Sequence, residues 1–408
     1  MKPTDIESLD VYRGHERIGS LFRTKKGADF QFTDPASIKD PKSCGLAFNI
    51  PFTENKVSVQ GANLHPFFAG LLPEGLRLSA LTRRVKTSAD DLFSLLVAVG
   101  SECIGDISVV PKGEALPASA SFADLSKPES LDFQELLRSS LNPDGSPEDM
   151  SLPGVQEKIS GSMISFPLRA NKTGAAFILK MNPPDRPLLV ENEFFFLRMA
   201  KACGLEVAEA KLVHDRNGAS ALLVRRFDRV FEKGNPIPRK LHQEDGCQIL
   251  DRYPADKYRI SCQEISNAIL EWTSTPALQQ LRFLELYAFS YLIGNGDLHA
   301  KNVSLRISPT TDLVELSPAY DLLSTQAYRG LDQHMAMKLG PRDDKFRAKD
   351  FIEFGLRNGA LELPIRKMLT RLCRKAEPWL DSLSEVAWPS RDRDRIARCL
   401  KDRIKRLP

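Results

Sequence analysis

The chain has 408 residues, enough for two or three packed units, and its 42% hydrophobic and 27% charged content is ordinary for a soluble globular protein. Its net charge of +4 is small beside 57 basic and 53 acidic residues, so bulk charge indicates no nucleic-acid partner. Seven scattered cysteines without a C-x-x-C pair argue against a disulfide framework or a zinc knuckle and favour a reducing cytosol. With no export signal and no apolar run of about 18 residues, we expect a cytoplasmic protein without a membrane anchor.

Residues 1–112 are predicted to form an N-terminal α+β subdomain. L-D-V-Y near residue 9 and R-I-G-S-L-F near residue 17 alternate as two short strands across a turn. D-L-F-S-L-L-V-A-V-G from residue 91 predicts a helix that ends at Gly100. Residues 111–130 are rich in Pro, Ser and Ala and have no helical or strand period. Together with the polar stretch that ends at residue 150, they predict a connecting segment over residues 113–150.

Residues 151–240 are predicted to form a small strand-rich lobe with one helix. F-I-L-K (177–180) has strand character, and the helix that includes Asn192 is predicted to end with Gly204 just after its last turn. A-K-L-V-H and A-L-L-V-R-R-F are strand-like runs, and the Asn217-Gly218 pair between them predicts a hairpin.

Residues 241–408 are predicted to form a mainly helical C-terminal lobe. L-Q-Q-L-R-F-L-E-L-Y-A-F-S-Y-L-I (278–293) is apolar nearly all round, which predicts a buried helix. The basic tail at 391–406 carries Ile396, Leu400 and Ile404 at helical spacing and predicts a solvated amphipathic helix.

A polar cluster, G-N-G-D-L-H-A-K-N, follows the buried helix directly. Its glycines place the cluster on a loop held by a rigid core element. Asp297 and Asn302 are five residues apart, the spacing of the kinase catalytic-loop pair in which an Asp accepts the hydroxyl proton and an Asn holds a metal. Two strand-like runs, 303–307 and 313–316, then return the chain so that Asp321 lies near Asn302.

This order of residues predicts a magnesium site made by Asn302, Asp321 and nucleotide phosphates, with Asp297 free to act as the base. The alternative is that Asp297 and Asn302 merely cap turns. His299 and Lys301 either touch phosphate or only hold the shape of the loop. Metal ligation by His299 is not expected, because no second His or Cys lies at ligand spacing.

Phosphate binding is predicted for a second group of residues. S-L-P-G-V-Q-E-K (151–158) precedes an alternating strand pattern, and backbone amides around Gly154 could face an anion. The segment is not a Walker motif. Lys180 ends a strand from which its ammonium could reach the phosphates, and Glu193 on the next helix could hold that ammonium.

The motifs resemble, in order and approximate spacing, those of the HipA family of serine/threonine kinase toxins. The motifs that carry the resemblance are S-L-P-G-V-Q-E-K, F-I-L-K, N-E-F-F-F-L, R-R-F-D-R, H-Q-E-D-G-C-Q, G-N-G-D-L-H-A-K-N and P-A-Y-D, with F-F-A-G-L-L-P-E-G (67–75) in the N-terminal unit. The resemblance implies a two-lobed protein-kinase-like α+β fold with an additional N-terminal subdomain. It also implies ATP and Mg²⁺, a DNA-binding HipB-type antitoxin, and growth arrest through phosphorylation of cytosolic translation proteins such as aminoacyl-tRNA synthetases.

The resemblance also assigns roles to individual residues. Asp297 and Lys180 match the catalytic Asp and the phosphate-binding Lys, Asn302 and Asp321 match the metal ligands, and Ser151 matches the serine that autophosphorylates. The residues expected to contact ATP are Ser151, Leu152, Pro153, Gly154, Val155, Lys158, Lys180, Gln243, Glu244, His299 and Lys301. Gln243 and Glu244 are included because H-Q-E-D-G looks like the linker that holds adenine.

Two other functions remain open at this point. D-L-H-A-K-N is also similar to the catalytic loop of small-molecule phosphotransferases that act on aminoglycosides or choline. A non-catalytic co-repressor that acts on DNA through its antitoxin is the second alternative. The intact set of Lys180, Asp297, Asn302 and Asp321 argues against a protein that has lost catalysis.

Overall fold

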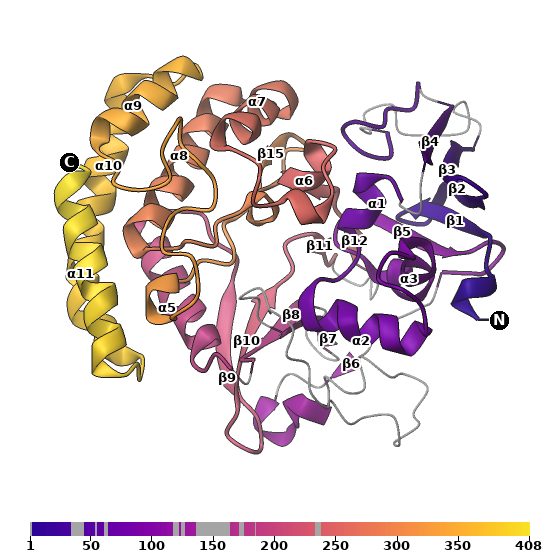
Figure 1. Ribbon diagram of the computed structural model, residues 1–408, viewed down its shortest axis with the longest axis horizontal. Coiled ribbons are helices and arrows are strands. Elements are labelled where there is room, and N and C mark those ends of the chain that lie inside the picture. The colour runs from indigo at the N-terminus through magenta and orange to yellow at the C-terminus, as the bar shows by residue number, and fades with distance from the viewer. Residues whose placement is uncertain are drawn as a thin grey trace.

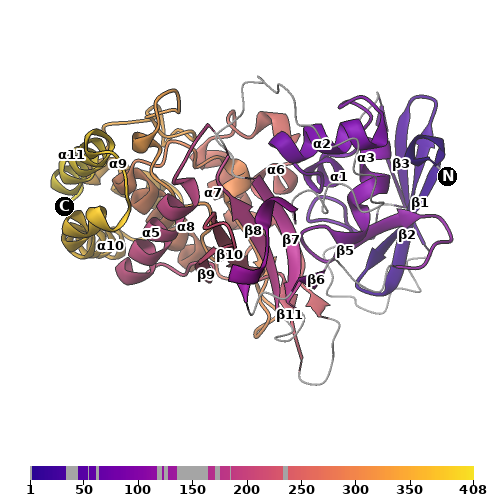
Figure 2. The ribbon, with the colours of Figure 1, turned by 90° about the horizontal axis from the view of Figure 1, so that it is seen from below.

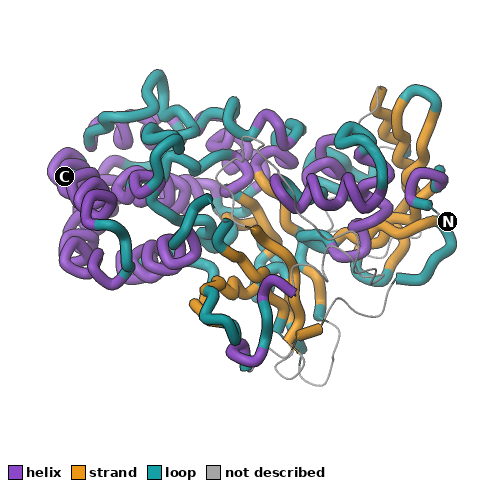
Figure 3. Tube along the Cα trace, turned by 60° about the horizontal axis from the view of Figure 1, so that its bottom comes forward, coloured by secondary structure: helices purple, strands orange, loops and turns teal. Residues whose placement is uncertain are grey.

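A computed structural model describes residues 2–33, 45–53, 55–60, 64–116, 122–123, 127–135, 164–170, 175–183, 185–232 and 238–408. The N-terminal sheet and the C-terminal helices lie at opposite ends of the molecule, and a second sheet lies between them (Figures 1 and 2). Figure 3 shows the same division, with strands gathered in the middle and at the N-terminal end and helices at the C-terminal end.

The N-terminal subdomain is an antiparallel sheet packed against short helices. Its strands have the order β4-β3-β2-β1-β5. They are β1 (Ser8–Arg13), β2 (Glu16–Thr24), β3 (Gly27–Phe32), β4 (Lys56–Gln60) and β5 (Ile107–Pro111), and the helices are α1 (Pro66–Gly70), α2 (Gly75–Val85) and α3 (Leu92–Val99) with the 3₁₀ turns Pro3–Asp5 and Gly100–Glu102. Buried Leu9, Val11 and Phe30 on the sheet pack with Phe68 and Leu95 on the helices. The predicted strand pair and the helix that ends at Gly100 are confirmed.

The middle sheet has the order β6-β7-β8-β10-β9. Its members are β6 (Phe122–Ala123), β7 (Ile164–Ala170), β8 (Ala176–Met181), β9 (Ala210–His214) and β10 (Ser220–Arg225), followed by the small hairpin β11 (Arg229–Val230) and β12 (Arg239–Lys240). The predicted β9–β10 hairpin turns at Gly218, whose φ is +77°. Helix α5 (Leu189–Cys203) packs on β8, β9 and β10 and ends at Gly204 in the left-handed conformation, as predicted. The prediction that 111–130 holds no strand is wrong, because β6 pairs in parallel with β7 across a long sequence separation.

The C-terminal lobe is mainly helical, as predicted. It comprises α6 (Gly246–Ile249), α7 (Cys262–Trp272), α8 (Pro276–Ile293), α9 (Ala348–Arg357), α10 (Glu362–Ala376), α11 (Ser390–Arg406) and the sheet β13 (Gln243–Asp245), β14 (Ser304–Ile307), β15 (Val314–Leu316). Among the described residues, no helix is long and apolar enough to cross a membrane. The six cysteines in the described part are free thiols.

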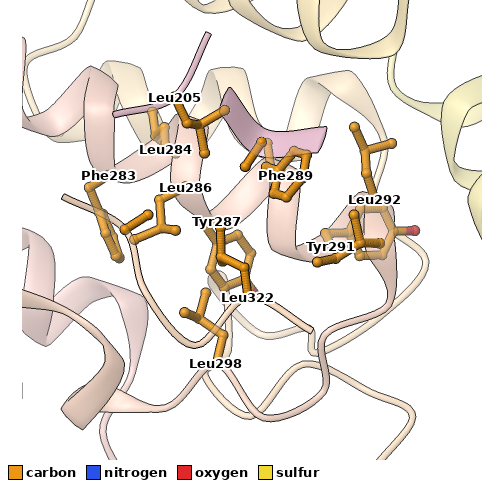
Figure 4. Packing of buried hydrophobic residues seen from close by; sticks show 14 of the residues in the cluster. Leu205, Phe283, Leu284, Leu286, Tyr287, Phe289, Tyr291, Leu292, Leu298 and Leu322 are labelled. Atoms are coloured by element: carbon orange, nitrogen blue, oxygen red, sulfur yellow. The ribbon is translucent and has the colours of Figure 1, made fainter. Parts of the chain in front are cut away.

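Helix α8 is the central element of this lobe. Figure 4 shows its side chains Phe283, Leu284, Tyr287 and Phe289 packed among residues from several other elements. Four helices contact it: α7, α9, α10 and α11. A helix that is apolar on all sides is stable only when surrounded in this way, so α8 provides a rigid base for the loop that follows it.

The last helix, α11, buries its apolar stripe rather than remaining wholly solvated. Ile396 and Leu400 are fully buried against the core, while most of its charged residues lie on the surface. The guanidinium of Arg403 lies 4.2 Å from the centre of the Tyr291 ring on α8. The predicted amphipathic helix is therefore confirmed, but only its polar face is solvated.

A buried polar cluster joins the N-terminal subdomain to the rest of the chain. The carboxylate of Asp228 lies 2.7 Å from both Arg226 and Arg229, and it accepts a hydrogen bond from the Gly105 amide at 2.9 Å. Both arginines also pair with Glu102, at 2.9 and 3.0 Å. Buried charges are stable only when they are paired. The charges of this cluster have partners in both parts of the chain, so the cluster stabilises the contact between the two parts.

Candidate active site

The loop after α8 is shaped by two glycines, Gly294 and Gly296. Gly294 ends α8 with φ at +72°, in the left-handed region that favours glycine. At Gly296 a Cβ atom would lie 2.1 Å from the backbone oxygen of Asp332, so a side chain there would force the backbone apart. The close packing fixes where the following residue, Asp297, enters the site.

A cavity of about 350 Å³ lies in front of this loop. The residues predicted from the sequence that line it are Lys180, Gln243, Asp297, His299, Lys301, Asn302 and Asp321. Ile178 and Val224 supply apolar surface, and Gly70–Gly75, Arg77, Cys103 and Ile104 of the N-terminal subdomain complete the wall. The structure therefore brings together most of the predicted site residues that it describes, and adds a wall that the sequence did not predict.

The carboxylate of Asp297 is the candidate base. Its half-buried carboxylate accepts a hydrogen bond from the Tyr258 hydroxyl, with 2.7 Å between Oη and Oδ1. Burial raises the pKa of Asp297 above its ordinary value, although the Tyr258 hydrogen bond acts in the opposite direction. Raising the pKa strengthens a carboxylate as a proton acceptor.

Asn302 and Asp321 meet across the β14–β15 hairpin, as predicted. The Asn302 amide nitrogen donates to Asp321 Oδ2 at 2.9 Å. The Asn302 amide oxygen is buried and has no hydrogen-bond partner among the described residues. An unpaired buried oxygen beside a carboxylate oxygen matches the hard ligands that Mg²⁺ takes, so these residues fit the ion. No group of three or more His, Cys, Asp or Glu in the described part could hold a metal by itself, and a magnesium nucleotide site needs none because phosphates and waters complete the shell.

Lys180 and Glu193 form the predicted buried ion pair. Lys180 Nζ lies 2.8 and 2.9 Å from the two carboxylate oxygens of Glu193 and also pairs with Asp321. Burial alone would lower the pKa of Lys180, but the two carboxylates raise it above its ordinary value. Burial raises the pKa of Glu193, which shares one ammonium with Asp321. Lys180 is thus a permanent cation at the position where phosphates were predicted.

His299 and Lys301 differ in their surroundings. Burial, followed by the nearby Lys257 ammonium, lowers the pKa of His299 to about 3, so the ring is neutral at pH 7. Its Nδ1 atom is buried and has no hydrogen-bond partner in the described part. Lys301 instead lies 3.1 Å from both Glu74 and Asp245, a placement that supports the loop-shaping alternative.

The predicted adenine linker requires one correction. Gln243 lines the cavity from β13, whereas Glu244 does not. The Glu244 carboxylate is fully buried and accepts hydrogen bonds from His242 Nε2 and from the Phe48 amide, both at 2.7 Å. Alternation along a strand explains the error, because successive side chains point to opposite faces. The Glu244 side chain therefore connects the domains and does not contact the cavity.

Sequence reasoning missed several residues that line the site, among them Glu74, Lys257 and Arg77. Glu74, which precedes α2, lies 2.6 Å from Lys257 and 3.1 Å from Lys301. Burial opposes its ionisation, but the two lysines lower the pKa of Glu74 to about 2. The motif F-F-A-G-L-L-P-E-G contains Glu74 and was the available signal, but a contact across more than 180 residues has no local sequence pattern.

Arg77 is the other unexpected cation. It lines the cavity from α2, and no ion pair or hydrogen bond of its side chain occurs within the described residues. Burial lowers the pKa of Arg77, and Arg226 acts in the same direction. A guanidinium without a carboxylate partner favours an anion in the cavity.

The predicted phosphate loop lies outside the described residues. This applies to Ser151, Leu152, Pro153, Gly154, Val155 and Lys158. Their predicted contacts with ATP remain predictions.

Comparisons with known proteins show which family the chain resembles. The family model described as HipA N-terminal domain matches residues 9–110, and the one described as HipA-like C-terminal domain matches residues 150–380. A putative kinase of Sinorhizobium fredii, Y4dM, is 31% identical over 348 residues, which are 79% of this chain and 78% of that protein. The serine/threonine-protein kinase toxin HipA of Shewanella oneidensis is 28% identical over 363 residues, 82% of this chain and 78% of that protein.

A solved structure extends the comparison to the fold. In the complex of Shewanella oneidensis MR-1 HipA, HipB and operator DNA, one chain matches with a TM-score of 0.76 and 23% identity, covering 98% of this chain and 97% of that one. This likeness shows the fold. The chain has the two-lobed, kinase-like α+β fold that the sequence predicted, with the additional N-terminal subdomain.

Proposed function

The chain belongs to the HipA family, and on this premise we propose that it is an ATP-dependent serine/threonine-protein kinase toxin of a toxin–antitoxin module. One observation carries the proposal. A single cavity holds a carboxylate with a raised pKa, an Asn–Asp pair with an unpaired oxygen, and a lysine cation. These are the parts that phosphoryl transfer requires.

Each residue of the cavity has its own role in the proposed reaction. Asn302 and Asp321 would hold Mg²⁺, which supplies charge that neutralises the phosphate oxygens. Lys180 adds a fixed positive charge, and Arg77, which has no ion pair within the described part of the chain, is a further cation for an anionic ligand. Asp297 accepts the proton of the acceptor hydroxyl. The oxygen of that hydroxyl bonds to the γ-phosphorus. The bond from that phosphorus to the bridging oxygen breaks, and ADP leaves with the electron pair.

The finer parts of the proposal follow the family. We propose a cytoplasmic protein with a HipB-type helix-turn-helix antitoxin as its partner, which would bring it to DNA indirectly. The protein acceptor belongs to the translation machinery, such as an aminoacyl-tRNA synthetase, and the enzyme also phosphorylates its own Ser151. The solved relative in complex with HipB and operator DNA supports the antitoxin partner.

The metal assignment predicts a magnesium-dependent loss in the variant Asp321→Ala. Removing this carboxylate should weaken ATP binding by at least about tenfold when Mg²⁺ is present, since loss of even an outer-shell partner acts on this scale. Nucleotide titrations with the ion and with a chelator make the comparison. An equal loss in both conditions would show that Asp321 is not a ligand.

The kinase toxin assignment predicts growth arrest that depends on Asp297. Cells that produce the wild-type chain without an antitoxin should stop dividing, whereas cells that produce Asp297→Asn should form colonies. The matched control is Asp312→Asn, an exposed turn residue with φ at +55°, a conformation that Asn tolerates; this variant should remain toxic. Equal toxicity of wild type and Asp297→Asn at equal protein level would favour a binding mechanism over catalysis.

A further inference from the structure

Tyr258 approaches the candidate base from the solvent side. Its side chain is 45% exposed, and it is not part of the cavity wall that Asp297, His299 and Lys257 form. Its hydroxyl nevertheless donates to Asp297 Oδ1 at 2.7 Å. Tyr258 therefore contacts the carboxylate of Asp297 without lining the cavity itself.

The backbone around Tyr258 is fastened in two directions. The Lys257 carbonyl accepts a hydrogen bond from the Ala300 amide at 3.2 Å, which ties this turn to the catalytic loop. The Lys257 ammonium lies 2.6 Å from Glu74, which ties the same turn to the N-terminal subdomain. These two contacts hold the backbone at Tyr258 in place, although the side chain of Tyr258 is half exposed.

The Tyr258 ring is also oriented by its neighbours. It meets the His299 ring edge to face, with 5.1 Å between ring centres, and the Lys257 ammonium lies 5.3 Å from its centre. One edge of the ring is thus packed, while much of its surface remains open to solvent. Tyrosine surface of this kind is typical of protein-binding sites, because it offers large apolar area at low entropic cost.

We propose that Tyr258 is a positioning residue of the acceptor site, a role that rests on the proposed kinase function. Its hydroxyl holds Asp297 Oδ1, which leaves the other carboxylate oxygen for the acceptor hydroxyl. Its exposed ring is the surface on which the Ser- or Thr-bearing segment of the acceptor protein lies. With the cavity assigned to nucleotide, the exposed Tyr258 ring offers the acceptor a surface beside Asp297 that the nucleotide does not use.

Two substitutions separate the hydroxyl from the ring. Tyr258→Phe removes only the hydrogen bond and should lower kcat about 3- to 10-fold, the range for one hydrogen bond, while the acceptor KM stays unchanged. Tyr258→Ala removes the ring as well and should also raise the acceptor KM, by about fivefold or more. Neither variant should change the affinity for ATP, because Tyr258 does not line the cavity.

The measurement uses the full-length protein, saturating ATP with Mg²⁺, and desalted bacterial lysate protein at increasing concentration as the acceptor probe. Phosphate incorporated into protein gives apparent kcat and KM, and ATP affinity is titrated separately. The matched control is Tyr253→Phe, a half-buried tyrosine five residues earlier, which should behave as wild type.

The outcomes distinguish this role from the function on which it rests. A wild-type enzyme that transfers no phosphate to protein overturns both the kinase function and the role of Tyr258. Transfer by the wild type that both Tyr258 variants match overturns the positioning role alone. A raised ATP dissociation constant in either variant, or phosphate found on Tyr258 itself, also overturns that role, because the residue would then be a nucleotide contact or an acceptor.

Discussion

Replacing Asp297 with Asn should lower the rate of phosphate transfer by about 10²–10⁴-fold, the usual contribution of a general base. The substitution keeps the size of the side chain and an oxygen that can accept the Tyr258 hydrogen bond. It removes the negative charge that accepts the proton. Because burial raises the pKa of this carboxylate, its basicity is a property of the site and an amide cannot reproduce it.

Single-turnover kinetics with the purified protein measure this effect, together with ATP affinity and thermal unfolding. Asp312→Asn is again the matched control and should transfer phosphate at the wild-type rate. A loss below about tenfold in Asp297→Asn, with folding and ATP affinity unchanged, would remove Asp297 from the role of base.

The second large effect concerns stability. Asp228→Ala should lower the free energy of unfolding by about 3–5 kcal/mol, the range for removing one partner of a buried ion pair. The variant leaves Arg226 and Arg229 buried with Glu102 as their remaining carboxylate, and it also removes the acceptor of the Gly105 amide. The loss falls on the contact between the N-terminal subdomain and the rest of the chain.

Glu209→Ala is the matched control for this prediction. Glu209 pairs with Arg225, the residue before Arg226, at 2.9 Å, but both side chains are more than half exposed. Exposed pairs contribute only about 0.2–1 kcal/mol. Urea unfolding of the two variants and the wild type compares them, and similar losses for Asp228→Ala and Glu209→Ala would mean that the buried cluster does not hold the two parts together.

The same contact should make the protein labile in acid. Lysines 257 and 301 lower the pKa of Glu74 to about 2 against its burial, and arginines lower the pKa of Asp228 in the same way. Unfolded carboxyl groups titrate near pH 4, so between about pH 4 and 2 the unfolded chain binds more protons than the folded one. The contribution of Glu74 and Asp228 to the free energy of unfolding should therefore be fully present above about pH 5 and decrease as pH falls toward 2. A profile that is flat from pH 5 to 2 would contradict the pairing of these carboxylates.

Local patterns predicted much of this structure, and contacts across the chain account for what they missed. Helix α8, its terminal glycine and the β14–β15 hairpin each follow from neighbouring residues, so the meeting of Asn302 with Asp321 was predictable. The Lys180–Glu193 pair followed from a strand and the helix after it. By contrast, Glu74 reaches Lys257 from the N-terminal subdomain, and Glu244 is buried against the Phe48 amide, which also belongs to that subdomain. Neither contact has a periodic signature, because both arise only when separate units dock.

The pairing of Glu74 with two lysines limits how the N-terminal subdomain can be exchanged between related proteins. The N-terminal subdomain is not structurally independent of the rest of the chain. It supplies one wall of the cavity and the carboxylate that pairs with Lys257 and Lys301. Recombination that exchanged this segment between relatives would produce chimeras in which the residue at position 74 comes from one parent and Lys257 and Lys301 come from the other. An exchange that removed Glu74 would leave Lys257 and Lys301, beside the loop of Asp297, without this carboxylate.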